Sequence, residues 1–301
     1  MKNINTILPF LKCPVTGGNL TFKNGELISE ADSNIKFPIV NNVIKFVSSD
    51  EGLSYNEHWE KFEDLTVSKT KLQQGEKFIN WVSSDKKMDD ESVILDIGCG
   101  DGSHIPYMPQ NAIKIALDYS DCVHIVEKRY RETNNLFIIQ ADAQRLPIKE
   151  NVIDFSIVYS CYNHLPDLKM GVSEGERVLK KNGYIGIWGY GTDSAFLYHG
   201  INFVRWVYHL FKNKAYHTFI AICLTPSLLF VRNSTGIRFG RNNFNEVYEI
   251  VSTNLSPEIV TLVYKFKWQD FVSKNLELIS EYGINCGQLF KKNNNYVDSK
   301  L

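Results

Sequence analysis

The chain has 301 residues, of which 44% are hydrophobic and 22% charged, so it can bury the core of one large domain with a small appendage. Its 33 Lys and Arg residues against 34 Asp and Glu leave a formal net charge of −1, which excludes a global electrostatic attraction to nucleic acid. The six cysteines form no CxxC pair, which favours reduced thiols in a cytoplasmic protein over a disulfide framework.

Residues 1–50 are predicted to form a small β-rich module. Short extended runs alternate with turns there, and the Asn24-Gly25 pair is typical of a hairpin. Residues 51–90 carry apolar residues at helical spacing, so we expect a helical lead-in. The N-terminus lacks the long apolar core of a secretory signal, and none is predicted.

From residue 91 to the end, the pattern predicts one α/β domain. Five apolar strands alternate with two helix-like segments, at 121–133 and 170–181, and two more strands close the chain. Continuous apolar strands separated by helices imply a mostly parallel sheet covered on both faces. The predicted fold is doubly wound and Rossmann-like, with seven strands and a helical insertion after the fifth, and ligands should bind outside the carboxyl ends of the strands.

The insertion, residues 192–260, is the predicted lid or acceptor pocket, and its aromatic helical face includes Trp206. Within it, the apolar run 219–231 contains Pro226 and is shorter than the roughly 20 residues that span a bilayer. No transmembrane segment is therefore predicted. The segment 196–231 remains a candidate for peripheral contact with a membrane surface.

Residues 93–102 read VILDIGCGDG, a glycine loop that three kinds of ligand could occupy. A nucleoside triphosphate needs a Lys followed by Ser or Thr after the last glycine, whereas Gly102 is followed by Ser103 and His104. A dinucleotide is disfavoured because the spacing is GxGxG, not GxGxxG. Asp96 and Asp101 would also repel a pyrophosphate. The sulfonium and ammonium of S-adenosyl-L-methionine (SAM) suit an acidic loop better.

Further acids follow the next two strands. Asp118 ends the strand IKIALD, where a carboxylate can accept both hydroxyls of an adenosine ribose. Asp142, followed by Ala143, comes after the strand NLFIIQ, where a carboxylate can accept a hydrogen bond from an adenine amino group.

Together, VILDIGCGDG, ALDYS, ADAQRLPIKENVIDFSIVYSCYNHLPD and GYIGIWGYG resemble the ordered motifs of class I SAM-dependent methyltransferases over residues 90–191. The resemblance implies that the loop cradles the methionine part of SAM, that Asp118 binds the ribose, and that Asp142 and Ala143 bind the adenine. Tyr159 and Ser160 would line the floor below the methyl group. The residues implied to bind the cofactor are Asp96, Gly98, Cys99, Gly100, Asp118, Tyr119, Asp142, Ala143, Tyr159 and Ser160.

The front of the chain, LKCPVTGGNL with KFPIVNNVIKFV, is similar to the zinc-ribbon-like domain that serves as the activator subunit of tRNA and release-factor methyltransferases. This sequence departs from the pattern at the metal ligands. Thr16 stands where a second cysteine is expected, and one thiolate, Cys13, cannot form a four-ligand zinc site. We expect a module without metal. A chance Cys-Pro pair in an unrelated hairpin module is the alternative.

The loop CYNHLPD supplies the candidates for the chemistry of the acceptor. His164 is a candidate general base, because the pKa of imidazole suits proton transfer near neutral pH. Tyr162, Asn163 and Trp206 are candidate acceptor contacts. A histidine in such a loop can also be without any role in proton transfer, so that both interpretations of His164 stay open.

The sequence leads to three hypotheses of function. The first is a SAM-dependent methyltransferase acting on a small-molecule, glycan or lipid-linked acceptor, with O-methylation favoured and S-adenosyl-L-homocysteine as product. The second is a tRNA or rRNA methyltransferase, suggested by the front module but disfavoured by the neutral charge. The third is a SAM-binding partner protein without turnover.

Overall fold

The computed structural model describes residues 3–47, 69–189, 191–192, 263–264, 268–282 and 287–293. The chain divides into two compact units, Met1–Tyr190 with Phe266–Leu301, and Gly191–Lys265. In the second unit the described residues form β10 (Gly191–Thr192) and β11 (Val263–Tyr264), which pair in parallel. The rest of the predicted insertion, 193–260, with its candidate membrane contact 196–231 and Trp206, lies outside the described residues.

A mixed sheet in the order β7-β6-β5-β8-β9-β13-β12 forms the centre of the first unit. Its strands are β5 (Val93–Ile97), β6 (Ile113–Asp118), β7 (Leu136–Gln140), β8 (Ile153–Tyr159), β9 (Leu179–Trp188), β12 (Leu276–Tyr282) and β13 (Gly287–Lys292). The first five pair in parallel, and the last two are antiparallel. The prediction of a doubly wound, mostly parallel α/β sheet is confirmed, and the seven predicted strands are present, but the sheet continues beyond them.

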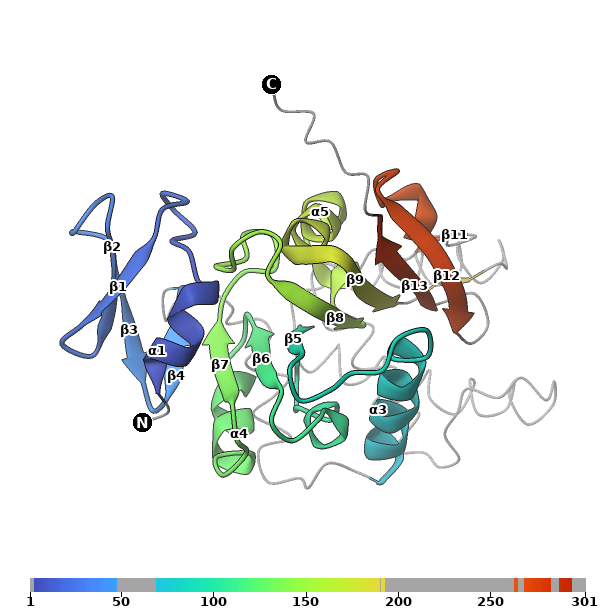
Figure 1. The fold of residues 1–301 in the computed structure, drawn as a ribbon, viewed down its shortest axis with the longest axis horizontal. Coiled ribbons are helices and arrows are strands. Elements are labelled where there is room, and N and C mark those ends of the chain that lie inside the picture. The colour runs from blue at the N-terminus through green and yellow to red at the C-terminus, as the bar shows by residue number, and fades with distance from the viewer. Residues whose placement is uncertain are drawn as a thin grey trace, which may run out of the picture. The chain divides into compact units, whose positions relative to one another are not determined.

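The front module joins this same sheet. Its strands are β1 (Leu20–Lys23), β2 (Glu26–Ser29), β3 (Lys36–Val40) and β4 (Val43–Lys45), preceded by α1 (Ile4–Ile7) and the short 3-10 helix η1 (Leu8–Phe10). The four strands form an antiparallel meander, and β4 then pairs in parallel with β7. The result is one continuous sheet of eleven strands (Figure 1).

A second contact ties the module to the loop that follows β7. The backbone N–H of Lys12 donates to the carbonyl of Pro147 at 3.0 Å, and the N–H of Lys149 donates to the carbonyl of Phe10 at 2.8 Å. The module therefore holds the segment 138–149 at both of its ends, through the β4–β7 pairing and through these two hydrogen bonds.

Helices cover both faces of the central sheet. They are α3 (Lys69–Val82), α4 (Cys122–Arg129) and α5 (Leu168–Val178). On β9, Gly186 faces α3, and the neighbouring Ile185 faces Gly175 of α5. Successive residues of a strand point to opposite faces, so α3 and α5 lie on opposite sides of the sheet. Helix α4 packs against β6 and β7 on the side of α3 (Figure 1).

Several expectations for individual elements can be compared with this structure. The predicted helical segments 121–133 and 170–181 contain or overlap α4 and α5, and the two final strands are β12 and β13. Helix α3 lies within the predicted lead-in 51–90, of which residues 51–68 are outside the described ones. None of the described helices is long and apolar enough to cross a membrane.

Candidate functional site

The glycine loop follows β5 at the carboxyl end of the sheet. Gly98, Gly100 and Gly102 have φ values of +73°, +51° and +75°, a region that side chains disfavour. A Cβ atom on Gly98 would lie 2.6 Å from the Sγ atom of Cys161, which follows β8. The loop thus turns sharply and lies directly against the loop after the neighbouring strand, which only glycine permits.

The backbone after the glycine loop is unlike a pyrophosphate site. In the described stretch 98–121, the loop leads into a 3-10 helix, η2 (Ile105–Tyr107), rather than an α-helix. A pyrophosphate site of the dinucleotide type uses the N–H groups and dipole of an α-helix N-terminus at this point. Asp101 is paired with Lys71 at 3.4 Å. The 3-10 helix in place of an α-helix supports the expectation of a ligand that is not a phosphate, whereas the pairing with Lys71 partly offsets the charge of Asp101.

Asp118 ends β6 and joins that strand to the glycine loop. Its Oδ2 atom accepts the backbone N–H of Gly100 at 3.0 Å, and its Oδ1 atom accepts both the N–H and the hydroxyl of Ser120, at 3.0 and 2.8 Å. Each carboxylate oxygen can accept two hydrogen bonds, so Oδ2 retains one acceptor position. The carbonyl of the next residue, Tyr119, accepts a hydrogen bond from Gln140 of β7.

Asp142 lies in the loop after β7, beside Asp118. The N–H of Ala141 donates to the carbonyl of Asp118 at 3.0 Å, which brings the two strand ends together. The Asp142 carboxylate accepts the backbone N–H of Gln144 at 2.8 Å and the side-chain amide of the same residue at 3.2 Å. Ala143, the other predicted adenine contact, is 5% exposed.

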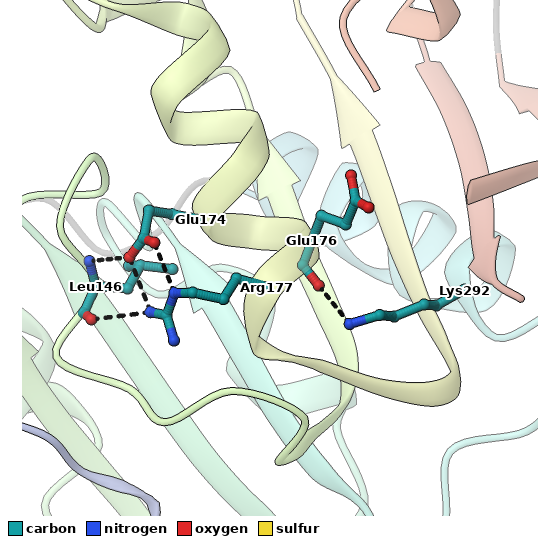
Figure 2. A network of polar contacts seen from close by, with 5 residues as sticks. All are labelled: Leu146, Glu174, Glu176, Arg177 and Lys292. Carbon is teal, nitrogen blue, oxygen red and sulfur yellow. Dashed lines mark hydrogen bonds and ion pairs between the residues drawn. The ribbon is translucent and has the colours of Figure 1, made fainter. Parts of the chain in front are cut away.

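Helix α5 holds the same loop a few residues further on (Figure 2). The backbone N–H of Leu146 donates to Glu174 at 2.9 Å, and its carbonyl accepts from Arg177 at 3.2 Å. Glu174 and Arg177 are themselves paired at 2.6 Å. The loop with Asp142 is therefore held by α5 from one side and by the front module from the other.

The three acids predicted from the sequence lie near one side chain, Cys161. Burial raises the pKa of the Cys161 thiol, and the carboxylates of Asp118, Asp96 and Asp142 raise it further because each repels a thiolate there. Their charges can act on one thiol only because the ends of β5, β6 and β7 and the loop after β8 meet at one edge of the sheet. Ser160, next to Cys161, has φ of +61° and turns this last loop back toward the glycines.

Other predicted cofactor residues contribute backbone or packing. Cys99 is buried under the loop among Ala116 and Val123, so its side chain belongs to the core. Tyr159, the last residue of β8, stacks on Trp188, the last residue of β9, with ring centroids 4.4 Å apart. Trp188 was not among the predicted site residues, although it is an aromatic residue at the end of a predicted strand.

The candidate acceptor residues lie in η3 (Tyr162–His164). Tyr162 is fully buried and packs against Gly171 and Gly175 of α5, and burial raises the pKa of its hydroxyl. Asn163 is also fully buried, close to Gly189. His164 is half-buried. In this structure, therefore, His164 has the most exposed side chain of the three, and the roles of all three remain predictions.

The buried carboxylate of Asp96 fits the cation that the sequence analysis proposed. Asp96 is 1% exposed, and its Oδ1 atom has no hydrogen-bond partner among the described residues. A buried carboxylate oxygen without a donor is unfavourable, and an ammonium group would provide the missing donor. The residues of this edge of the sheet thus suit SAM, with its ammonium near Asp96, the sharp glycine turn beside it, and the acids Asp118 and Asp142 further along.

No metal cluster is seen in the parts of the chain that the structure describes, where no three His, Cys, Asp or Glu side chains are grouped to hold an ion. In the front module, Cys13 is fully buried and its Sγ atom accepts the N–H of Thr16 at 3.4 Å. The absence of a metal from the module remains a prediction.

Comparison with known families assigns both parts of this arrangement. Residues 95–187 match the family model described as a methyltransferase domain, and residues 5–42 match the model described as Trm112p-like protein. The first range covers β5 to β9 with the three acids, and the second covers the front module up to the turn before β4.

Individual relatives are distant. An uncharacterized methyltransferase-like protein of Schizosaccharomyces pombe is 25% identical over 119 residues, which are 38% of this chain and 45% of that protein. The chain thus spans about half the length of the curated relative it matches. A SAM-dependent methyltransferase of Aquifex aeolicus gives a TM-score of 0.46 at 15% identity, covering 79% of this chain and 98% of the other.

A complex of the Haloferax volcanii Trm112 methyltransferase activator with a putative methyltransferase gives a TM-score of 0.37 at 15% identity, covering 51% of this chain and 67% of the other.

The two family models, together with the strand order and the site, define the class. The chain contains a class I SAM-dependent methyltransferase domain, whose cofactor is SAM. On the same chain, the segment that matches the Trm112p-like model, residues 5–42, precedes the segment that matches the methyltransferase model, residues 95–187.

Proposed function

We propose that the protein transfers a methyl group from SAM to a small-molecule, glycan or lipid-linked acceptor, with oxygen as the favoured acceptor atom. The observation that carries the first half of this proposal is the meeting of Asp96, Asp118 and Asp142 around Cys161, next to the glycine loop. Three acids at a glycine loop that is not followed directly by an α-helix N-terminus suit a cationic nucleoside and disfavour a dinucleotide.

In this proposal the site residues bind and orient. Asp96 and the glycine loop hold the methionine part, Asp118 the ribose, and Asp142 with Ala143 the adenine. Methyl transfer is an in-line displacement, in which the acceptor attacks the methyl carbon and S-adenosyl-L-homocysteine leaves, so that much of the rate enhancement can come from positioning. His164, in the loop after β8, is the candidate base for a hydroxyl proton.

The acceptor class is proposed from the sequence. Residues 192–260 stand where a minimal methyltransferase would continue directly to its last helix and strands, so we expect this segment to select the acceptor. RNA is the second candidate acceptor, and the match of residues 5–42 to the Trm112p-like model favours it. The net charge of −1 disfavours RNA, because it argues against a large surface that binds phosphates.

The cofactor is tested by calorimetry with S-adenosyl-L-homocysteine on the full chain, with NADH as the control ligand. Binding of the first and not of the second is expected, and the reverse would refute the proposal. The acceptor is tested by incubating the protein and methyl-labelled SAM with separate extracts of metabolites, glycans, lipids and RNA. Label is expected in the extracts of metabolites, glycans or lipids. Label in RNA alone would instead show that RNA is the acceptor.

A further inference from the structure

His104 forms a buried pair with Asp96. Its Nδ1 atom lies 3.1 Å from the Oδ2 atom of Asp96, and the two side chains are 6% and 1% exposed. His104 lies beyond the last glycine of the loop, outside the residues that the methyltransferase resemblance implicates. In the sequence analysis it served only to exclude a triphosphate loop.

Packing sets the orientation of the His104 ring. Its centroid lies 5.7 Å from that of Phe78 on α3 and 5.5 Å from that of Tyr159 at the end of β8. Helix α3 comes this close because Gly75 has no side chain; a Cβ there would lie 2.5 Å from the carbonyl oxygen of Ser103. The ring is therefore held between two aromatic neighbours, with Nδ1 directed at Asp96.

The pairing makes the two oxygens of Asp96 unequal. Oδ2 is bonded to His104, whereas Oδ1 is buried and has no hydrogen-bond partner among the described residues. Asp118 and Asp142 differ, since both oxygens of each accept hydrogen bonds from neighbouring residues. Of the three acids at the site, Asp96 is therefore the one with a whole oxygen that has no hydrogen-bond partner among the described residues.

We propose that His104 is a positioning residue for the amino-acid part of the cofactor. An ionised carboxylate only accepts hydrogen bonds, so Nδ1 carries the proton of this pair and holds Asp96 in one rotamer. Oδ1 would then be left to accept a hydrogen bond from the α-ammonium group of SAM. A positioned and desolvated acceptor binds a cation better than one that must first be ordered. This inference rests on the proposed function and adds a residue to it.

The test compares a ligand that has the α-ammonium group with one that lacks the amino-acid part. In His104→Phe, which keeps an aromatic ring but removes the donor, we expect the affinity for S-adenosyl-L-homocysteine to fall roughly 10- to 100-fold, the range of a charge-assisted hydrogen bond. The affinity for 5′-methylthioadenosine should change less than about twofold. In His104→Asn, whose amide nitrogen can occupy the place of Nδ1, both affinities should stay within about threefold of wild type.

Circular dichroism and thermal unfolding establish that each variant is folded, and His104→Leu replaces His104→Phe if that variant is not. Equal weakening of both ligands in the donor-less variant would overturn the inference, because it would indicate a packing role alone. Unchanged binding of S-adenosyl-L-homocysteine would overturn it as well. Failure of the wild-type chain to bind S-adenosyl-L-homocysteine would instead refute the proposed function, and the inference with it.

Discussion

The carboxylate of Asp118 accepts the backbone N–H of Gly100 at 3.0 Å, so the acid at the end of β6 and the glycine loop after β5 form one hydrogen-bonded unit. Asp118 also orders its own turn through Ser120. The residue proposed to bind the ribose thus holds in place the loop proposed to bind the methionine part, and a change at Asp118 should affect both.

Asp118→Asn is expected to weaken binding of S-adenosyl-L-homocysteine by roughly 10- to 100-fold. The carboxylate accepts hydrogen bonds from Gly100 and Ser120 through both oxygens, whereas the amide nitrogen of Asn is a donor and cannot accept one. Calorimetry measures the effect. The matched control is Asp154→Asn, an acid at the opposite end of the sheet that bonds to Val93 and Lys180. Its affinity should equal that of wild type, and a similar loss in both variants would contradict the prediction.

Gly98→Ala should disrupt the loop in two ways. The positive φ of +73° costs about 1 kcal/mol for a residue with a side chain, and the new Cβ collides with Cys161. We expect the free energy of unfolding to fall by about 2 kcal/mol or more, and binding of S-adenosyl-L-homocysteine to be lost. Urea unfolding and calorimetry measure the two effects.

Two further variants separate strain from collision at Gly98. Gly25→Ala has a similar φ of +83° but meets nothing within 4 Å, so it should cost only about 1 kcal/mol and leave binding intact. Adding Cys161→Gly to Gly98→Ala should restore part of the stability. No recovery in the double variant would mean that the contact between the two loops does not limit the substitution.

The network on α5 in Figure 2 gives a prediction of stability. Glu174→Ala removes the acceptor of the Leu146 N–H and the partner of Arg177, so we expect a loss of about 2 kcal/mol in the free energy of unfolding. Arg131→Ala is the control; Arg131 is 60% exposed in its pair with Glu127, so its removal should change the free energy of unfolding much less than Glu174→Ala. Equal losses in denaturant titrations would show that the contact with Leu146 contributes nothing.

Buried thiols predict sensitivity to alkaline pH. Burial raises the pKa of Cys122 to about 11, above its value in the unfolded chain. The folded state then retains a proton that the unfolded state has lost, so this contribution to stability is complete below about pH 8.5 and disappears as the pH rises toward 11. Between about pH 9 and 11, we expect the free energy of unfolding to fall less steeply with rising pH in Cys122→Ala than in wild type. Parallel pH profiles would contradict this assignment.

Much of the fold could be predicted because local patterns suffice for it. The apolar runs ending in Asp118 and before Asp142 are strands in the structure, and the glycines at 98, 100 and 102 adopt the backbone that their lack of a side chain permits. The order of acids along parallel strands also implied a shared edge, since carboxyl ends of parallel strands meet there.

Other features of the site could not be read from the chain. His104 is eight residues from Asp96 and shows no spacing typical of a pair, because their contact depends on the packing of α3, which Gly75 brings close. Tyr162 was predicted as a candidate acceptor contact in a loop, and its side chain is fully buried, because the glycines of α5 leave room for its ring. In each case the partner is a residue of another element, whose distance the sequence does not encode locally.

By itself, the sequence determined the class of sheet, the glycine loop and the acids suited to a cationic nucleoside, because each depends on residue type and on period along one strand. The tertiary structure decided that β4 continues the sheet at β7 and that three acids lie near Cys161. It also decided that His104 binds one oxygen of Asp96 while the other has no hydrogen-bond partner among the described residues. These relationships join residues of different elements. They exist only once register and side-chain packing have set the distances between those elements.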